Sequence, residues 1–403
     1  MSPKTRPPAR RKTQPSRGSQ PRVGPVTGRL ADVPALDIDS LIADKGVRIL
    51  VCCGSGGVGK TTTSAALAVR AAERGRRVVV LTIDPARRLA QSMGLTQLDN
   101  TPRPVPGIDT SGAGSLDAMM LDMKRTFDEV VEAHATPDKA AQIFANPFYQ
   151  ALSSSFAGTQ EYMAMEKLGQ LHSEALRTGR WDLIVVDTPP SRSALDFLDA
   201  PERLSSFLDG RLIRILLAPA KGPARFLSAS MAVVTNAITK VVGGQVLRDV
   251  QTFVAAFDTL FGGFRARADQ TYRILKDAQT AFVVVASPDA DALREAAFFV
   301  ERLGEEGMPL AGLVLNRVTA STTPGISAKA ALAAAERLGE TEPVTGGLLR
   351  LHAERLSRID REQALRRRFA AVHPRVATAT VPALACDVHD LEALRQVSAL
   401  LAA

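Results

Sequence analysis

The sequence predicts an α/β protein built on a doubly wound, mainly parallel β-sheet. Short apolar runs rich in β-branched residues alternate with helical stretches along most of the chain, which is the order of elements in a parallel sheet with crossover helices. The runs are continuously apolar instead of alternating, so helices should cover both faces of the sheet. Crossovers between such strands are right-handed, and ligands bind outside the carboxyl ends of the strands.

Seven runs are predicted to form the strands, the third of them with the weakest signal. They are VRILVCC (47–53), VVVLTI (78–83), AMMLDM (118–123), LIVVD (183–187), FVVVAS (282–287), LAGLVLN (310–316) and VATATVP (376–382). Two of the intervening segments, residues 61–75 and 291–307, have clear helical patterns, and the first ends on Gly75. We expect these elements to form one domain over residues 46–403.

Two long intervals have helical patterns and no strand signal, roughly residues 124–180 and 197–278. In the second interval, apolar residues recur at spacings of three and four from Leu227 to Val241, which is one stripe of a helix. We expect both intervals to form a helical subdomain inserted into the sheet domain. The apolar segment 226–242 is expected either in the core or along a hydrophobic groove.

Residues 1–45 have the composition of a disordered basic tail and linker. Residues 1–30 hold eight Lys or Arg and no acidic residue. The whole chain has 50 basic and 42 acidic residues, so without these eight the rest of the chain has 42 of each. The net charge of +8 therefore belongs to the tail, which has too little apolar surface to offset the entropy of ordering. It is expected either to have no specific role or to be attracted weakly to anionic lipid or nucleic acid. No specific nucleic-acid partner is expected.

The cysteine pattern favours a reducing, cytoplasmic location. Cys52, Cys53 and Cys386 form neither a disulfide framework nor a CxxC metal site, and the adjacent pair is expected to end a buried strand. No segment reaches the roughly 18 to 20 uncharged apolar residues of a transmembrane helix. The nearest, residues 226–239, has 14 residues between two basic ones, which leaves a peripheral association with a membrane open.

The segment GSGGVGKT, from Gly54 to Thr61, has the spacing of a phosphate-binding loop. A strand precedes it and a helix without proline follows, which is the context that such a loop needs. Its glycines allow backbone N–H groups to surround phosphate oxygens, and the helix N-terminus adds positive potential. Lys60 would reach the β- and γ-phosphates, and the Thr61 hydroxyl would bind Mg²⁺. The predicted nucleotide contacts here are Gly56, Gly57, Val58, Gly59, Lys60, Thr61 and Thr62.

Two aspartates follow predicted strands. Asp84 ends the strand of residues 78–83 and would lie beside the loop if the two strands are neighbours. Asp187 ends an apolar strand, as expected for the carboxylate that holds Mg²⁺ through water. Either residue alone could be a strand-end cap or a turn residue, but their order after the phosphate-binding loop favours the nucleotide site.

Five segments together resemble the ArsA-like ATPases, a family of P-loop NTPases with a deviant Walker A loop. The segments are GSGGVGKTTT (54–63), DPARRLAQSMG (84–94), DTPPSRSALDFL (187–198), LVLNR (313–317) and VPALACDVHDLEAL (381–394). The resemblance runs from about residue 47 to 400. This family, called anion-transporting ATPases, includes the arsenite-pump ATPase and the guided-entry ATPase that targets tail-anchored membrane proteins. The resemblance implies an ATP phosphohydrolase that uses ATP and Mg²⁺.

The resemblance also implies roles for individual residues. Asp84 matches the first-switch aspartate that orients the attacking water, and with Lys60 it would be catalytic. Asp187 matches the second-switch aspartate near Mg²⁺. Asn316 matches the asparagine that reads adenine, and Pro382 would pack near the base. The switches would couple hydrolysis to movement of the helical subdomain in a dimer that binds a hydrophobic protein client or a membrane partner.

Three departures from the family limit the assignment. Ser55 replaces a loop lysine that reaches phosphates bound by the partner subunit, and Arg87 and Arg88 replace the His-Asn pair of the targeting members. The cysteines that bind zinc or arsenic in relatives are missing. We therefore expect a heterodimer in which a related ATPase supplies the lysine, or a homodimer in which Arg87 or Arg88 replaces it. The alternatives are an ATPase subunit of an arsenite-type efflux system and a positioning ATPase like ParA or MinD.

Overall fold

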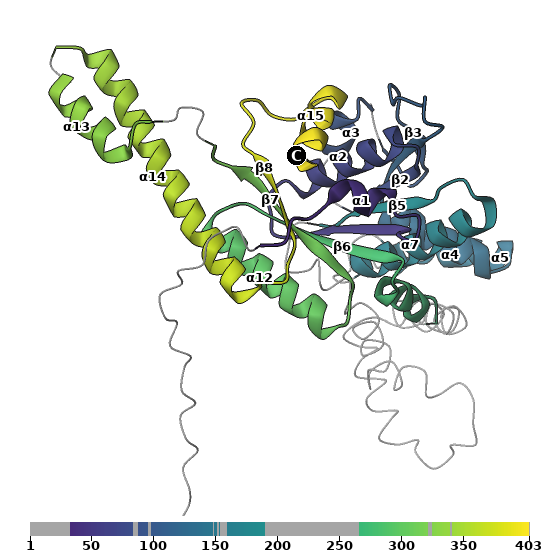
Figure 1. Ribbon diagram of the computed structural model, residues 1–403. Coiled ribbons are helices and arrows are strands. Elements are labelled where there is room, and N and C mark those ends of the chain that lie inside the picture. The colour runs from purple at the N-terminus through teal and green to yellow at the C-terminus, as the bar shows by residue number, and fades with distance from the viewer. Residues whose placement is uncertain are drawn as a thin grey trace, which may run out of the picture.

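The computed structural model of the protein describes residues 33–83, 88–95, 98–147, 149–150, 153, 159–189, 266–320, 325–338 and 341–402. Its centre is an eight-stranded sheet in the order β3-β4-β2-β5-β1-β6-β7-β8, and every neighbouring pair is parallel except β3 and β4 (Figure 1). The strands are β1 (Ile49–Cys53), β2 (Arg77–Thr82), β3 (Arg103–Pro104), β4 (Ser115–Met120), β5 (Leu183–Asp187), β6 (Thr280–Ala286), β7 (Leu310–Val318) and β8 (Thr378–Pro382). All seven predicted strands are present, and the mainly parallel α/β fold is confirmed.

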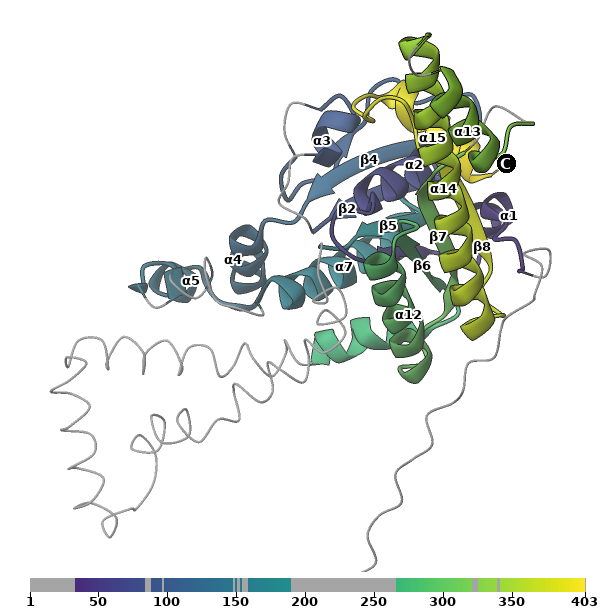
Figure 2. The same cartoon turned by 90° about the vertical axis from the view of Figure 1, so that its left-hand side faces the viewer.

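Helices lie on both faces of this sheet (Figures 1 and 2). They are α1 (Ile38–Ala43), α2 (Lys60–Glu73), α3 (Arg88–Ser92), α4 (Met123–His134), α5 (Pro137–Phe144), α7 (Thr159–Thr178), α12 (Ala290–Glu305), α13 (Ala328–Leu338), α14 (Pro343–Val372) and α15 (Leu391–Leu401). None of the helices in the described ranges is long and apolar enough to cross a membrane.

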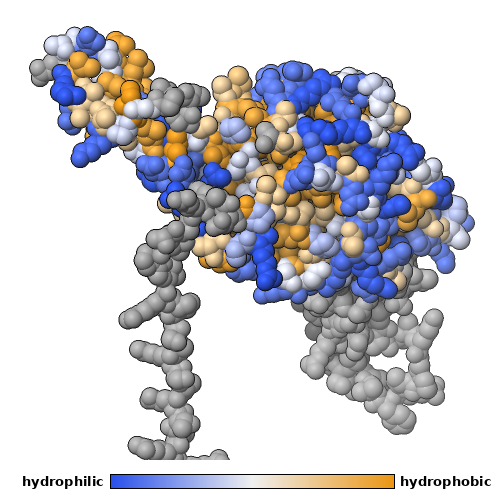
Figure 3. All heavy atoms as spheres, in the orientation of Figure 1, coloured by the Kyte–Doolittle hydropathy of each residue, from blue (hydrophilic) through white to orange (hydrophobic). Residues whose placement is uncertain are grey.

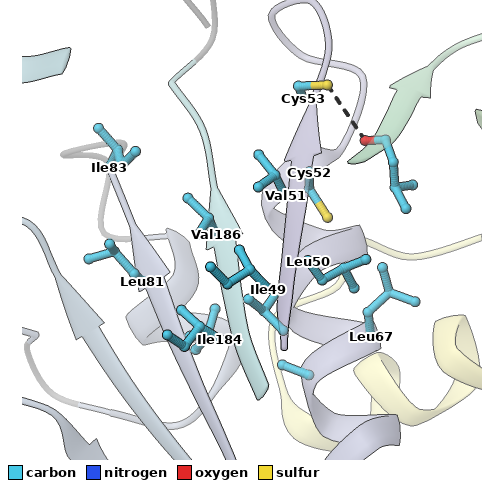
Figure 4. Close-up of a cluster of buried hydrophobic side chains, with 14 of the residues drawn as sticks. Ile49, Leu50, Val51, Cys52, Cys53, Leu67, Leu81, Ile83, Ile184 and Val186 are labelled. Carbon is cyan, nitrogen blue, oxygen red and sulfur yellow. Dashed lines mark hydrogen bonds between the residues drawn. The ribbon is translucent and has the colours of Figure 1, made fainter. Parts of the chain in front are cut away.

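The central strands form the core of the protein. Every residue of β1, β5 and β6 is buried, which explains their continuous apolar sequences. Side chains such as Leu50, Leu81 and Val186 belong to one cluster of buried hydrophobic side chains around the central strands (Figure 4). At the end of β1, Cys52 and Cys53 are buried as expected, and burial raises the pKa of the Cys53 thiol to about 12.

The folded domain begins earlier than the sequence predicted. Residues 1–32 lie outside the described residues, but the expected linker contains α1, whose Ile38 and Ile42 are buried in the core. Asp39 of this helix accepts two hydrogen bonds from the Arg70 guanidinium, at 2.6 and 2.8 Å, and Ala35 pairs with β8. The segment from residue 33 to 45 is therefore part of the domain, because its two isoleucines and the ion pairs of Asp39 with Arg70 and Arg74 anchor it.

Arg76 fixes the same segment from inside the protein. It is 3% exposed, and its guanidinium donates to the carbonyl oxygens of Ile42 at 2.7 Å and Val47 at 2.8 Å. It also donates to the carboxylate of Asp182 at 2.6 Å, just before β5. A buried charge with this many acceptors stabilises the fold, since each of its donors is satisfied within the chain.

The described parts of the two helical intervals contain helices. In the first interval these are α4, α5 and α7, and α7 joins the hydrophobic core with Met163, Ala164 and Leu168 fully buried. In the second interval, residues 266–276 are helical. The apolar segment 226–242 lies outside the described residues. The inserted helical subdomain therefore stays a prediction.

A helical hairpin of α13 and α14 extends away from the sheet (Figures 1 and 2). Its outer end carries exposed apolar side chains, among them Leu332, Val344 and Leu348, which are 48%, 75% and 63% exposed (Figure 3). The other part of α14 is fixed to the sheet, because the Glu362 carboxylate accepts hydrogen bonds from the backbone N–H of Thr319 at 2.8 Å and from its hydroxyl at 2.6 Å.

Candidate nucleotide site

A glycine-rich loop, residues 54–59, joins β1 to α2. Gly54 has a φ of 147°, and a Cβ atom there would lie 2.1 Å from the carbonyl oxygen of Val285 on β6. Gly59 has a φ of 95°, and a Cβ atom there would lie 2.2 Å from Nδ2 of Asn316. Both positions require glycine, since the backbone conformation and the contact distance each exclude a side chain.

The end of the loop is the N-terminus of α2. Gly59 is the N-cap residue and supplies no side-chain hydrogen bond to the first turn. The first N–H groups of a helix have no partner within the helix, and with the helix dipole they favour an anion. Lys60 adds a positive charge: it is 5% exposed, and its Nζ donates to the carbonyl oxygen of Ser55 at 2.7 Å. This arrangement fits phosphate groups.

Two hydroxyl groups and a carboxylate meet where β5 ends beside the loop. Asp187 is fully buried, and its Oδ2 accepts hydrogen bonds from Thr61 Oγ1 at 2.8 Å and from Thr82 Oγ1 at 2.9 Å. The strand register explains the cluster, because Asp187 lies opposite Cys52 of β1 on one side and Thr82 of β2 on the other. Oxygen ligands of this kind are those that Mg²⁺ prefers, so the residues fit the predicted metal site. Thr61 would hold the ion directly and Asp187 through water, and the ion would neutralise phosphate charge.

The end of β7 contacts the outer side of the loop. Asn316 is 9% exposed, and its Nδ2 donates to the carbonyl oxygen of Val58 at 2.9 Å. Its Oδ1 accepts from the backbone N–H of Arg317 at 3.0 Å. The Arg317 side chain in turn donates from Nη1 to the carbonyl oxygen of Gly57 at 2.8 Å. Two consecutive residues of β7 thus hold two consecutive carbonyl groups of the loop.

A hollow of about 900 Å³ joins these parts and has the size of a small-molecule site. Loop and α2 residues form one wall, and the end of β8 with the segment that follows it forms a second wall, in which Val381 to Leu384 make an apolar part, the apolar wall. Seven of the predicted nucleotide contacts line this hollow: Gly57, Gly59, Lys60, Thr61, Thr62, Asn316 and Pro382. Gly56 and Val58 belong to the loop itself.

The first switch falls outside the described residues. The described part of the chain does not include Asp84, Arg87 or the side chain of Arg88, so the water-orienting role of Asp84 stays a prediction. The sheet order places β5 between β1 and β2, so the strand that leads to Asp84 is not the direct neighbour of the strand that leads to the loop. The carboxyl ends of β1, β5 and β2 nevertheless lie at the same edge of the sheet.

Three contacts at the site were not predicted from the sequence. Thr82 bonds to Asp187, and Arg317 bonds to the loop, as described above. Gln160 of α7 donates from Nε2 to the carbonyl oxygen of Ile83 at 2.9 Å, one residue before Asp84. Two of them have a signal in the sequence, because Thr82 is a polar residue in an apolar strand and Arg317 follows Asn316 in the LNR segment.

Residues 47–333 match the family described as anion-transporting ATPase, the ArsA ATPases. The chain belongs to this family. It is 27% identical to ATPase ARSA2 of Chlamydomonas reinhardtii over 72% of each chain. It is also 27% identical to ATPase GET3 of Malassezia globosa over 45% of this chain and 51% of that protein. Identity to the arsenical pump-driving ATPase of Escherichia coli is 30%, over 39% of this chain and 26% of that protein.

These matches confirm the resemblance to ArsA-like ATPases that the motifs indicated. They also confirm the P-loop NTPase fold and, at the level of the family, the ATPase class of enzyme. The matched part spans about half the length of the GET3 relative and about a quarter of the arsenical pump relative.

Proposed function

We propose that this ArsA-family ATPase binds and hydrolyses ATP with Mg²⁺ as one half of a dimeric switch. The observation that carries the proposal is the hydrogen bond from Thr61 Oγ1 to Asp187 Oδ2 at 2.8 Å. It joins the phosphate-binding loop to the carboxylate at the end of β5, and this is the pair of groups that a nucleotide-bound Mg²⁺ needs.

The loop supplies most of what phosphoryl transfer requires. Such a reaction depends on positioning and on neutralising charge more than on covalent chemistry. The N-terminus of α2 and Lys60 would hold the phosphates, and Asn316 and Pro382 would hold the adenine side. Asp84 would orient the attacking water, at the carboxyl end of the strand next to β5.

A hydroxyl deletion tests the proposal most directly. Thr61→Val keeps the shape of the side chain but removes the hydroxyl, and it should lower Mg²⁺-dependent phosphate release from ATP by about 10- to 100-fold. The matched control is Thr63→Val, which removes a buried hydroxyl from the same helix, two residues further along. Equal activity of the two variants would contradict the assignment. Asp84→Asn should keep ATP binding and lose turnover.

The switch proposal rests on a contact between the helical interval and the strand that precedes Asp84. Gln160 lies at the start of α7, and its amide holds the backbone one residue before that aspartate. A nucleotide-dependent movement of the first switch would therefore reach α7, whose inner face is buried in the hydrophobic core. We infer that this movement changes binding of a hydrophobic protein client or a membrane partner.

The dimer is proposed to be a heterodimer because of Ser55. Serine is short and uncharged, so it cannot replace the family's loop lysine, which reaches the phosphates bound by the other subunit. A homodimer of this chain would therefore lack that positive charge at both of its nucleotide sites. A related ATPase with the lysine would complete the site built on Lys60 and Asp187 of this chain. The alternative is a homodimer in which Arg87 or Arg88 supplies the charge.

Restoring the lysine distinguishes these two dimers. If the missing charge limits the chain, Ser55→Lys should raise ATPase activity of the isolated protein at least about tenfold, within the range of a lost electrostatic group. Ser55→Gln, which has length without charge, should leave the activity low. Full activity of the unmodified chain alone, with no gain from Ser55→Lys, would exclude the heterodimer.

The match to an arsenical pump-driving ATPase supports a second candidate, an ATPase subunit of an efflux system. Stimulation of ATP hydrolysis by arsenite would favour that function. Stimulation by a hydrophobic polypeptide in the absence of arsenite would favour the client-binding switch.

A further inference from the structure

We propose that Arg317 positions the nucleotide by lying along one face of its base. The inference rests on the proposed nucleotide site and assigns a contact with the ligand to a residue described so far only by its bond to the loop. It follows from the backbone of Arg317, from its anchoring and from its place in the hollow.

The backbone of Arg317 is in an unusual conformation. Its φ is 61°, and Ala113 is the one other non-glycine residue with a positive φ in the described part of the chain. Residues with a Cβ atom rarely adopt this conformation outside functional sites and turns. It coincides with an irregularity in the pairing of β7 with β8, between Leu315 and Val318. At this irregularity the Arg317 side chain reaches the phosphate-binding loop.

One edge of the Arg317 guanidinium is fixed. Nη1 donates to the carbonyl oxygen of Gly57 at 2.8 Å, and Oδ1 of Asn316 accepts from the Arg317 backbone N–H at 3.0 Å. Within the described ranges, no carboxylate is close enough to form an ion pair with it. A guanidinium held at its edge by a carbonyl group keeps both planar faces available, and such a face stacks well on an aromatic ring.

The position of Arg317 favours the base over the phosphates. Arg317 follows Asn316 in the chain, and its neighbour Val318 pairs with Pro382 in the apolar wall of the hollow. Lys60 and the N-terminus of α2 mark the phosphate end of the same hollow. A purine that packs on the apolar wall would therefore have the Arg317 guanidinium available for its opposite face.

Comparing two ligands tests this role. ATP has a base, whereas inorganic tripolyphosphate has only the phosphates, and calorimetric titration of the full chain with Mg²⁺ gives an affinity for each. Arg317→Met keeps the length of the stem and removes the guanidinium. We expect the affinity for ATP to fall about twofold to thirtyfold, the range of a cation–π contact, while the affinity for tripolyphosphate is unchanged.

A matched control is Arg358→Met. Arg358 of α14 lines an adjoining hollow together with Arg317 but does not line the nucleotide hollow, so this variant should bind both ligands normally. An equal loss for ATP and tripolyphosphate in Arg317→Met would show that Arg317 acts on the loop or the phosphates and would overturn the inference. Unchanged ATP binding would overturn it too. Wild-type protein that binds neither ligand would overturn the proposed function itself.

Discussion

Replacing Gly59 with alanine should destabilise the chain even in the absence of nucleotide. The residue has a left-handed backbone, and a Cβ atom would lie 2.2 Å from Asn316 Nδ2. Gly57 provides a matched comparison, because its φ of 78° is also left-handed but its Cβ atom would have no neighbour within 4 Å. The two substitutions therefore share the backbone strain and differ in the clash.

The expected difference follows from these contacts. A left-handed residue with a side chain costs roughly 1–2 kcal/mol, and both variants should lose this much. In Gly59→Ala the Asn316 side chain must also move, which breaks its hydrogen bonds to Val58 and Arg317, each worth about 1 kcal/mol. Gly59→Ala should therefore lower the free energy of unfolding by about 2 kcal/mol more than Gly57→Ala.

Urea denaturation followed by circular dichroism measures both free energies of unfolding. A second pair of variants isolates the clash: in an Asn316→Ala background, the cost of Gly59→Ala should fall to that of Gly57→Ala. Equal destabilisation by the two glycine substitutions in the wild-type background would refute the explanation. So would an unchanged cost of Gly59→Ala after the asparagine is removed.

Two other predictions concern stability and thiol chemistry. Arg76→Met should lower the free energy of unfolding by about 3–5 kcal/mol, because it leaves buried acceptors without their partner. Arg77 is half exposed beside the same aspartate, so Arg77→Met should lower it by less than about 1 kcal/mol. Similar urea midpoints for the two variants would contradict this. A disulfide reagent at neutral pH should modify only Cys386 in the native chain, since Cys52 and Cys53 are buried and burial raises the pKa of both thiols. All three cysteines should react in urea, and more than one fast-reacting thiol in the native protein would show that β1 is less protected than described.

The fold and the phosphate-binding loop could be predicted because their signals are local. Each central strand is an unbroken apolar run, and the loop has a fixed spacing between a strand and a helix. The sequence does not predict the short strand β3, since two residues carry no pattern. The helix α1 lies in the segment that the composition predicts as a linker, because its sequence signals are few: one capping aspartate, Asp37, and two isoleucines four residues apart.

The contacts that complete the site could not be predicted in the same way. Thr82 contacts Asp187 because β2 and β5 are neighbours in the sheet, and neither strand's sequence predicts which strand lies beside it. Gln160 reaches Ile83 across 77 positions of the sequence, with no pattern in α7 to mark it. The LNR segment contains Arg317, but its bond to Gly57 depends on a positive φ, which the sequence does not predict at a residue other than glycine.

The long helix α14 joins two regions that face different constraints. Near Glu362 the helix holds Thr319, three residues after Asn316. An insertion or deletion in this part of α14 would turn or shift Glu362 away from Thr319 and would disturb the nucleotide hollow. The first turns of the helix, from Pro343 to about Leu351, lie roughly 15 to 30 Å away along the helix axis. Insertions or deletions at the hairpin tip should therefore be tolerated by the ATPase, which leaves the tip free to diverge between related chains while the other end of the helix cannot.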